Sequence, residues 1–223
     1  MAIIDIKFMN NEGYLLKDIP LSLCECEKQM RLIKYDEFYD HYRSFRDDNG
    51  VENTQFPSII FSFYNIIFCQ NKMPSPQDLL KEYYELYDDQ ITINGSKVYY
   101  NGNEYSKECL DARILRTYPS LVRDYHFYLM LVENKTFDKV IYSCKTDISG
   151  KDILIIHNDK QYEVSLFVET KRGNFFKNIK NAYRHKYANE IQLPLNLKTA
   201  EKCGDFFVYS VCHIEKIKKS ILK

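Results

Sequence analysis

The spacing of apolar residues changes part-way along the chain, and this change constrains the fold more than any other feature. Between residues 24 and 133 most apolar residues recur every three or four positions, which is typical of helices that bury one face. Beyond residue 139 they gather in short runs between polar residues, which is typical of strands. The sequence therefore predicts a mixed α/β (α+β) fold, in which a mainly helical N-terminal region precedes a central mixed sheet flanked by helices.

The N-terminal part also has clear boundary signals. Ser75 and Pro76 are an N-cap and a first helical residue, and the pairs Asn94-Gly95 and Asn101-Gly102 bracket alternating apolar residues, which predicts a β-hairpin. We expect a strand over residues 3–8, a hairpin over 91–102, and helices over 24–46, 56–70, 78–87 and 106–133. Pro119 predicts a break in the last helix, with Ser120 as the cap of its second piece.

The C-terminal part is expected to alternate between strands and helices. The predicted strands cover 139–144, 152–157, 162–171, 191–195 and 206–212, and the predicted helices cover 174–188 and 213–222. We place a boundary between an N-terminal region, residues 1–105, and a core domain, residues 106–223.

Charge is distributed unevenly along the chain, although 31 basic and 31 acidic residues cancel overall. Residues 1–150 carry 17 basic and 23 acidic residues, whereas residues 151–223 carry 14 basic and 8 acidic ones. Such an asymmetry indicates a polyanionic partner for the basic part.

Cysteine content indicates a reducing compartment. The seven cysteines form no Cys-x-x-Cys pair, so neither a disulfide framework nor a zinc or iron–sulfur spacing is indicated. The first residues lack the order of a signal peptide, and the apolar stretch 56–69 is too short for a membrane span of about 20 residues. We expect a cytoplasmic protein without a membrane anchor.

Two acidic residues and a lysine are placed to meet at one end of the predicted sheet. Asp152 opens one strand, and Glu169 and Lys171 end the next on the same face, because alternate side chains of a strand point the same way. Carboxylate oxygens are suitable ligands for Mg²⁺, and a bound metal can activate water for phosphodiester cleavage. Lys171 can orient that water or offset negative charge.

This arrangement resembles the PD-(D/E)xK (restriction endonuclease-like) nuclease superfamily. The resemblance covers roughly residues 120–212, in the order helix, three strands, helix, strand. It implies that Asp152 and Glu169 bind Mg²⁺, for which Mn²⁺ can substitute, and that Lys171 assists catalysis. Members often add an acidic residue from the preceding helix, for which Asp124 is preferred here over Glu133. Lys151 stands where the proline of the motif would be.

The segment after Lys171 is basic throughout. Residues 172–187 contain five Lys or Arg residues, one histidine and no acidic residue. We expect a helix that holds nucleic-acid phosphates without reading sequence. The candidate contacts are Arg172, Lys177, Lys180, Arg184, His185 and Lys186.

These patterns predict a metal-dependent endonuclease that acts on DNA, in a mobile-element, phage or defence setting. The acidic N-terminal region would contact a protein partner or a second copy of the chain in a homodimer. The alternative is a catalytically inactive nucleic-acid-binding or protein-interaction module that keeps a nuclease-like sheet.

Overall fold

The computed structural model describes residues 21–46, 48–142, 152–170 and 189–221. They belong to two compact units, which divide between Val122 and Arg123. This division falls within the long helix α6 (Lys107–Asn134), whereas the sequence analysis placed its boundary near residue 105. The two units are described separately below.

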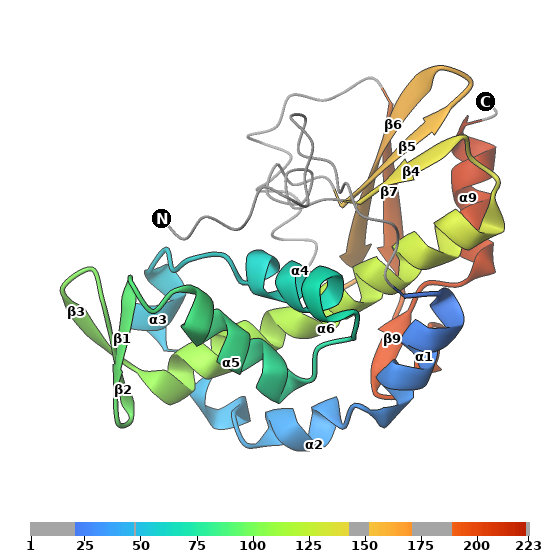
Figure 1. Cartoon of the computed structure of the whole chain (residues 1–223). Helices are drawn as coiled ribbons and strands as arrows, with labels where there is room; N and C mark the ends of the chain where they lie inside the picture. Colours follow the sequence, from blue (N-terminus) through green and yellow to red (C-terminus); the bar gives the residue numbers. More distant parts are fainter. Residues whose placement is uncertain (1–20, 47, 143–151, 171–188, 222–223) are drawn as a thin grey trace. The chain divides into compact units, whose positions relative to one another are not determined.

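Unit 1, which ends at Val122, contains a series of helices before a small sheet (Figure 1). The helices are α1 (Leu23–Leu32), α2 (Tyr35–Asp40), the 3-10 turn η2 (Arg43–Phe45), α3 (Asn49–Asn53), α4 (Ile59–Gln70) and α5 (Pro76–Leu86). The predicted start of α5 is confirmed: the Ser75 side chain accepts from the Asp78 amide, and the Asp78 carboxylate accepts from the Ser75 amide. Pro76 occupies the first turn, where its missing N–H is not needed.

The prediction of a single helix over 24–46 is wrong, because the segment divides into α1, α2 and η2. The break lies at Ile33, whose backbone is extended, and Lys34 starts α2 without a side-chain cap. Local periodicity is overridden here by long-range contacts, since Tyr35 is buried and donates a hydrogen bond to the carbonyl of Leu115.

Three short strands form an antiparallel meander in unit 1: β1 (Ile91–Asn94), β2 (Lys97–Tyr100) and β3 (Asn103–Ser106). Both predicted turns are present, but the first is formed by Gly95 and Ser96, because Asn94 ends β1 and pairs with Lys97. At the second Asn-Gly pair, Asn101 and Gly102 both have positive φ, of 50° and 75°, as a type I′ turn requires. Strand β3 was not predicted, because its residues are mostly polar and lack a clear alternation.

Helix α6 is continuous through Pro119, so the predicted break is wrong. Ser120 does not cap a second helix; its hydroxyl donates to the carbonyl of Thr117. Pro119 has no N–H to donate to Leu115, four residues earlier. The Tyr35 hydroxyl donates to that carbonyl at 3.0 Å, which replaces the missing helical bond.

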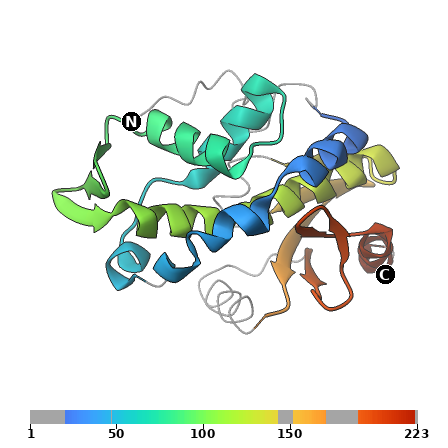
Figure 2. The ribbon, with the colours of Figure 1, turned by 90° about the horizontal axis from the view of Figure 1, so that it is seen from below.

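Unit 2 contains a four-stranded mixed sheet in the order β4-β5-β6-β7 (Figure 1), and Figure 2 gives the view from below. The strands are β4 (Lys139–Ile141), β5 (Ile153–His157), β6 (Lys160–Val168) and β7 (Glu190–Leu195). β4, β5 and β6 pair antiparallel, whereas β7 runs parallel to β6. The mixed sheet and the α/β class are therefore confirmed.

The rest of unit 2 follows β7. A small hairpin, β8 (Glu201–Cys203) and β9 (Phe206–Val208), leads into helix α9 (Val211–Ile221), which packs against β7. The predicted strand 206–212 thus ends four residues early, because α9 begins at Val211. The predicted strand 3–8 and helix 174–188 lie outside the described residues.

Aromatic side chains fill much of the core of each unit. Tyr83 and Tyr118 are fully buried in unit 1, and Tyr125, Tyr142 and Tyr209 are fully buried in unit 2. Several of their hydroxyls bond to main-chain carbonyls: that of Tyr83 to Pro57, that of Tyr118 to Pro74 and that of Tyr209 to Leu193. In these three tyrosines the buried hydroxyl is hydrogen-bonded while the ring packs in the core.

Candidate functional site in unit 2

Asp152 lies directly before β5 and contacts the neighbouring strand. Its Oδ2 atom accepts a hydrogen bond of 2.5 Å from the backbone amide of Leu166 on β6. The amide of an inner strand would ordinarily bond to a carbonyl of its neighbour. The carboxylate thus extends the β5–β6 ladder by one bond, and it is half-buried in doing so.

Glu169 follows β6 and is exposed. Its backbone amide donates to the carbonyl of Leu195 at 2.9 Å, which continues the parallel pairing of β6 with β7 by one residue. Glu169 also lines a pocket of about 550 Å³ together with residues from β7 and the start of α9. An exposed carboxylate at the rim of a pocket is accessible to a ligand from solvent.

The strand register determines the spacing between these two carboxylates. Because Ile153 pairs with Val164, Asp152 comes opposite Ser165, and the Leu166 amide that it contacts lies three residues before Glu169. Three residues of strand span about 10 Å. Oxygen ligands bind Mg²⁺ at about 2.1 Å. For the two carboxylates to share one ion, the side chain of Glu169 has to extend back along β6.

A third carboxylate, Asp124 on α6, lies next to a buried arginine. Arg123 Nε is 3.8 Å from Asp124 Oδ1, and only 8% of Arg123 is exposed. Arg123 and Asp124 therefore form a local ion pair. Glu133, the other candidate, lies in the last turn of the same helix.

The charges of Asp124 and Asp152 both act on the buried phenol of Tyr209. Burial raises the pKa of Tyr209 well above its usual range, the carboxylates of Asp124 and Asp152 raise it further, and Arg123 opposes them. The hydroxyl lies 3.4 Å from the carbonyl of Phe167, two residues before Glu169. Acidic groups from α6 and from the start of β5 thus lie in the surroundings of one tyrosine, close to the end of β6.

The pocket beside Glu169 contains polar residues that the sequence analysis did not select. They include Glu201, Ser210, Cys212, His213 and Lys216. Ser210 precedes α9, and its backbone amide donates to His213 Nδ1 at 3.1 Å. The sequence Ser210-Val211-Cys212-His213 has the spacing of a helix start, which could have drawn attention to this group.

Part of the expected site lies outside the described residues. This applies to Lys171 and to the candidate phosphate contacts Arg172, Lys177, Lys180, Arg184, His185 and Lys186. Within the described ranges, no three His, Cys, Asp or Glu side chains come together as ligands of one metal ion. Mg²⁺ is often held by one or two carboxylates with water and substrate oxygens, so the oxygen donors of Asp152 and Glu169 suit it chemically.

Searches for similar proteins found none. No family model, curated protein or solved structure matches the chain.

Among the helices that the structure describes, none combines the length and the apolar character needed to cross a membrane.

Proposed function

We propose that unit 2 is a metal-dependent nuclease that hydrolyses phosphodiester bonds in DNA. The observation that carries the proposal is the placement of two carboxylates, Asp152 and Glu169, along the C-terminal part of β6. The Asp152 carboxylate accepts from the Leu166 amide of β6. The Tyr209 hydroxyl lies beside the carbonyl of Phe167, and Asp124 and Asp152 both raise its pKa. Glu169 follows Phe167 by two residues. The order of α6, three antiparallel strands and a parallel fourth strand supports the restriction endonuclease-like core expected from the sequence.

The residues would divide the work as follows. Asp152 and Glu169 supply oxygen ligands, and a bound Mg²⁺ would acidify a water molecule and offset charge on the phosphate. Lys171 orients the attacking water, and the basic segment 172–187 holds neighbouring phosphates. Because Glu169 opens onto the pocket, the substrate would approach from that side.

A specific observation favours the alternative, a nucleic-acid-binding module without catalysis. The Asp152 carboxylate already accepts a backbone hydrogen bond, so it has a structural role that requires no metal. An inactive module would keep the basic segment and bind DNA without cutting it.

Plasmid cleavage separates the two functions. The full chain is incubated with supercoiled plasmid and Mg²⁺ or Mn²⁺, beside Glu169→Gln and Lys171→Ala. We expect nicking by the wild type and none by either variant. Glu215→Gln is the matched control, since Glu215 is an exposed carboxylate on α9 that pairs with Lys218, and it should cut normally. Equal nicking by wild type and Glu169→Gln, or no nicking by any protein, would exclude the nuclease.

DNA binding is tested separately through the basic segment. Lys177→Glu combined with Arg184→Glu should weaken binding and reduce its dependence on salt, because fewer counterions are released. The control combines Lys28→Glu with Lys81→Glu, two exposed lysines of unit 1. If both double variants bind alike, the basic segment does not hold the phosphates.

A further inference from the structure

Most polar groups of the pocket in unit 2 have no role in the nuclease proposed above. Glu169 is used there, but the lining also contains Asn196, Thr199, Glu201, His213 and Lys216. The pocket measures about 550 Å³. Sites for small organic molecules have volumes of about 300–1,000 Å³. The pocket is therefore large enough for a small molecule of its own.

The start of α9 forms part of the pocket wall and presents backbone donors to it. Val211 and Cys212 are the first two residues of this helix, and both line the pocket. Amides in the first turn of a helix have no acceptor within the helix. Among the described residues, neither of these two amides is bonded to another acceptor. The helix dipole adds positive potential at this end, so the wall favours an anionic group.

A buried histidine adds a side-chain donor to the same wall. Only 8% of His213 is exposed, and its Nδ1 atom accepts from the Ser210 amide at 3.1 Å. This bond uses the single lone pair of the neutral ring, so the ring proton is on Nε2. Burial and the charge of Lys216 lower the pKa of His213, although Glu201 opposes them, and the ring is therefore neutral near pH 7.

The Nε2 proton of His213 is directed to a ligand by elimination. Among the described residues, no acceptor is bonded to Nε2, while the ring itself lines the pocket. A buried N–H group without an acceptor is costly. Nε2 is the one polar atom of this side chain that the helix start leaves available. This second observation, independent of the helix dipole, also indicates an acceptor in the pocket.

Lys216 supplies the charge that an anion requires. It is exposed, it lines the pocket, and it follows Cys212 by four residues, which places both on the same face of α9. Two amides, one imidazole N–H and one ammonium group can together donate to the three terminal oxygens of a phosphate. A carboxylate has two oxygens and would leave part of this donor set unused. The donors therefore suit a phosphate monoester.

The remaining lining residues indicate what the rest of the ligand carries. Glu169 and Glu201 repel a phosphate, but their oxygens accept hydrogen bonds from hydroxyl and amino groups. The side chains of Met130, Pro194 and Leu195 add apolar surface. A ligand with a phosphate at one end, and with hydroxyl or amino groups and a flat ring at the other, matches all of these groups. Nucleotides have this chemistry.

We propose that this pocket binds a nucleoside monophosphate, either free or as the phosphorylated end of a nucleic-acid chain. The phosphate accepts from the amides of Val211 and Cys212, from His213 Nε2 and from Lys216. Glu201 accepts from a hydroxyl or amino group of the nucleoside. Binding makes and breaks no covalent bond and requires no metal ion, so it does not depend on the nuclease function.

Calorimetric titration of the full chain tests the proposal without metal. The probe is 2′-deoxyadenosine 5′-monophosphate, in EDTA near pH 7.5, where its phosphate is a dianion. We expect saturable binding with a Kd below about 1 mM, and binding at least about 10-fold weaker for 2′-deoxyadenosine, which lacks the phosphate. Equal affinity for the two compounds, or no saturable binding of the nucleotide, would overturn the proposal.

Competition identifies the source of the phosphate. If the pocket takes chain ends, a short oligonucleotide with a 5′-phosphate should displace the nucleotide, and the same oligonucleotide with a 5′-hydroxyl should not. If neither displaces it, the free nucleotide is the ligand. Equal displacement by both would place the nucleotide on a general phosphate-binding surface and would reject the pocket.

Two variants test the named donors. Lys216→Gln should weaken nucleotide binding by about 10-fold, whereas Lys219→Gln, at an exposed position of α9 that does not line the pocket, should bind like the wild type. His213→Glu removes the Nε2 donor but keeps an acceptor for the Ser210 amide, because glutamate suits the third position of a helix. It should bind at least about 10-fold more weakly. Wild-type affinity in Lys216→Gln would overturn the proposal even if His213→Glu does not fold.

Discussion

The hydroxyl of Tyr35 donates a 3.0 Å hydrogen bond to the carbonyl of Leu115, the acceptor that Pro119 leaves without its helical donor. Tyr35 begins α2, and Leu115 lies in the interior of α6, 80 residues later. Both side chains are buried, so no water reaches the carbonyl easily. A long-range contact thus makes a proline tolerable inside a helix.

Removing the hydroxyl of Tyr35 should therefore destabilise unit 1 only while the proline is present. Tyr35→Phe leaves the Leu115 carbonyl unpaired, and the expected loss is about 1–3 kcal/mol of unfolding free energy. With Pro119→Ala, the amide of residue 119 can donate to Leu115, so Tyr35→Phe should cost less. Urea unfolding of the two single variants and the double variant measures this coupling. The same cost in both backgrounds would mean that Tyr35 does not replace the missing bond.

Asp152 offers a way to separate structure from catalysis. Asp152→Ala removes the acceptor of the Leu166 amide and should cost about 1–3 kcal/mol in urea unfolding. Asp152→Asn keeps an oxygen in the same place, so most of the stability should remain. If Asp152 also binds metal, the asparagine variant should be stable and yet fail to nick plasmid. A fully active Asp152→Asn variant would limit this residue to its structural role.

The start of α5 should make stability depend on pH. Burial alone would raise the pKa of Asp78, but hydrogen bonds from Ser75 and the charge of Lys72, 3.0 Å away, lower it below its ordinary value. A lowered pKa in the folded state contributes stability above the unfolded value, and this contribution is lost as pH falls through the folded value. The difference in stability between wild type and Asp78→Asn should thus shrink between pH 7 and about pH 3.

The cap itself can be measured at constant pH. Ser75→Ala should destabilise the protein by about 1 kcal/mol, because the Asp78 amide loses its acceptor. Ser220→Ala is a suitable control, since Ser220 is exposed near the end of α9 and bonds only to a carbonyl of its own helix. Equal unfolding midpoints for the two variants would contradict the prediction.

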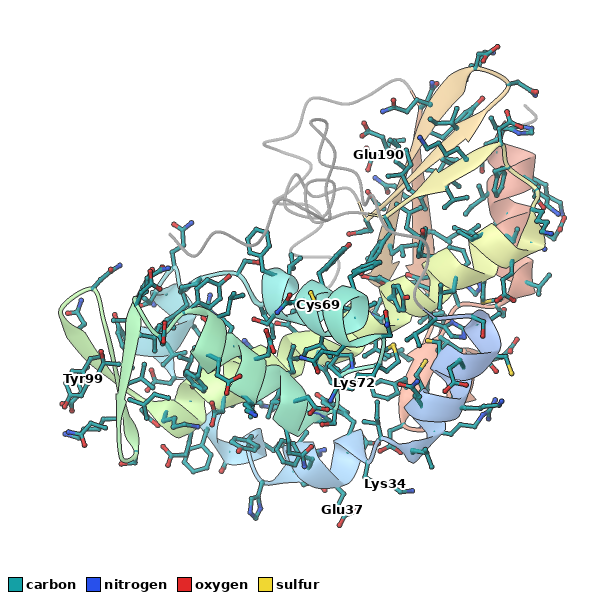
Figure 3. The ribbon with its side chains drawn as sticks, in the orientation of Figure 1. Lys34, Glu37, Cys69, Lys72, Tyr99 and Glu190 are labelled. Atoms are coloured by element: carbon teal, nitrogen blue, oxygen red, sulfur yellow. The ribbon has the colours of Figure 1, made fainter. Side chains whose placement is uncertain are left out.

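Tyr209→Phe tests the phenol whose hydroxyl bonds to carbonyls of β6 and β7. The hydroxyl bonds to the buried carbonyl of Leu193 at 3.2 Å, so its loss should cost about 1 kcal/mol. The ring contacts with Phe127 and His213, at 4.8 and 5.0 Å between centroids, should persist. Tyr99→Phe, at an exposed position of β2 (Figure 3), should change stability by less than about 0.5 kcal/mol.

Local signals in the sequence were sufficient for some elements. The cap and proline at Ser75 and Pro76, and the two turns at Gly95 and Gly102, depend on interactions over a few residues, and both features were predicted. Strands β4, β5 and β6 were also anticipated, because their apolar runs are short and clearly bounded.

Other elements depend on contacts between distant residues. The division of the segment 24–46 follows from the burial of Tyr35 against Leu115, and the continuity of α6 through Pro119 follows from the same bond. The sequence around Tyr35 does not indicate that Leu115 is its partner, and the sequence around Leu115 does not indicate Tyr35. The pocket at α9 was missed for a similar reason, because Glu169 and His213 are brought together only by the fold.

The candidate site was anticipated in its residue types but not in its geometry. Asp152 and Glu169 flank β5 and β6 as expected, yet the sequence did not indicate that Asp152 would bond to the Leu166 amide. The register of an antiparallel pair sets the spacing between two such residues, and a shift by one position changes it by a whole residue. The distance between the carboxylates was therefore not predictable from spacing along the chain.

The tyrosine-rich core also determines how the protein responds to alkali. Burial raises the pKa of Tyr128 to about 12, and it raises those of Tyr83, Tyr118 and Tyr209 further above their ordinary value of 10.0. Because the folded state keeps these phenols protonated, their contribution to stability is complete below about pH 10 and declines as pH rises above it. The chain has no tryptophan, so ultraviolet absorption by phenolate would report this loss directly. The same packing that stabilises the core of each unit at neutral pH should therefore make that core unfold in base.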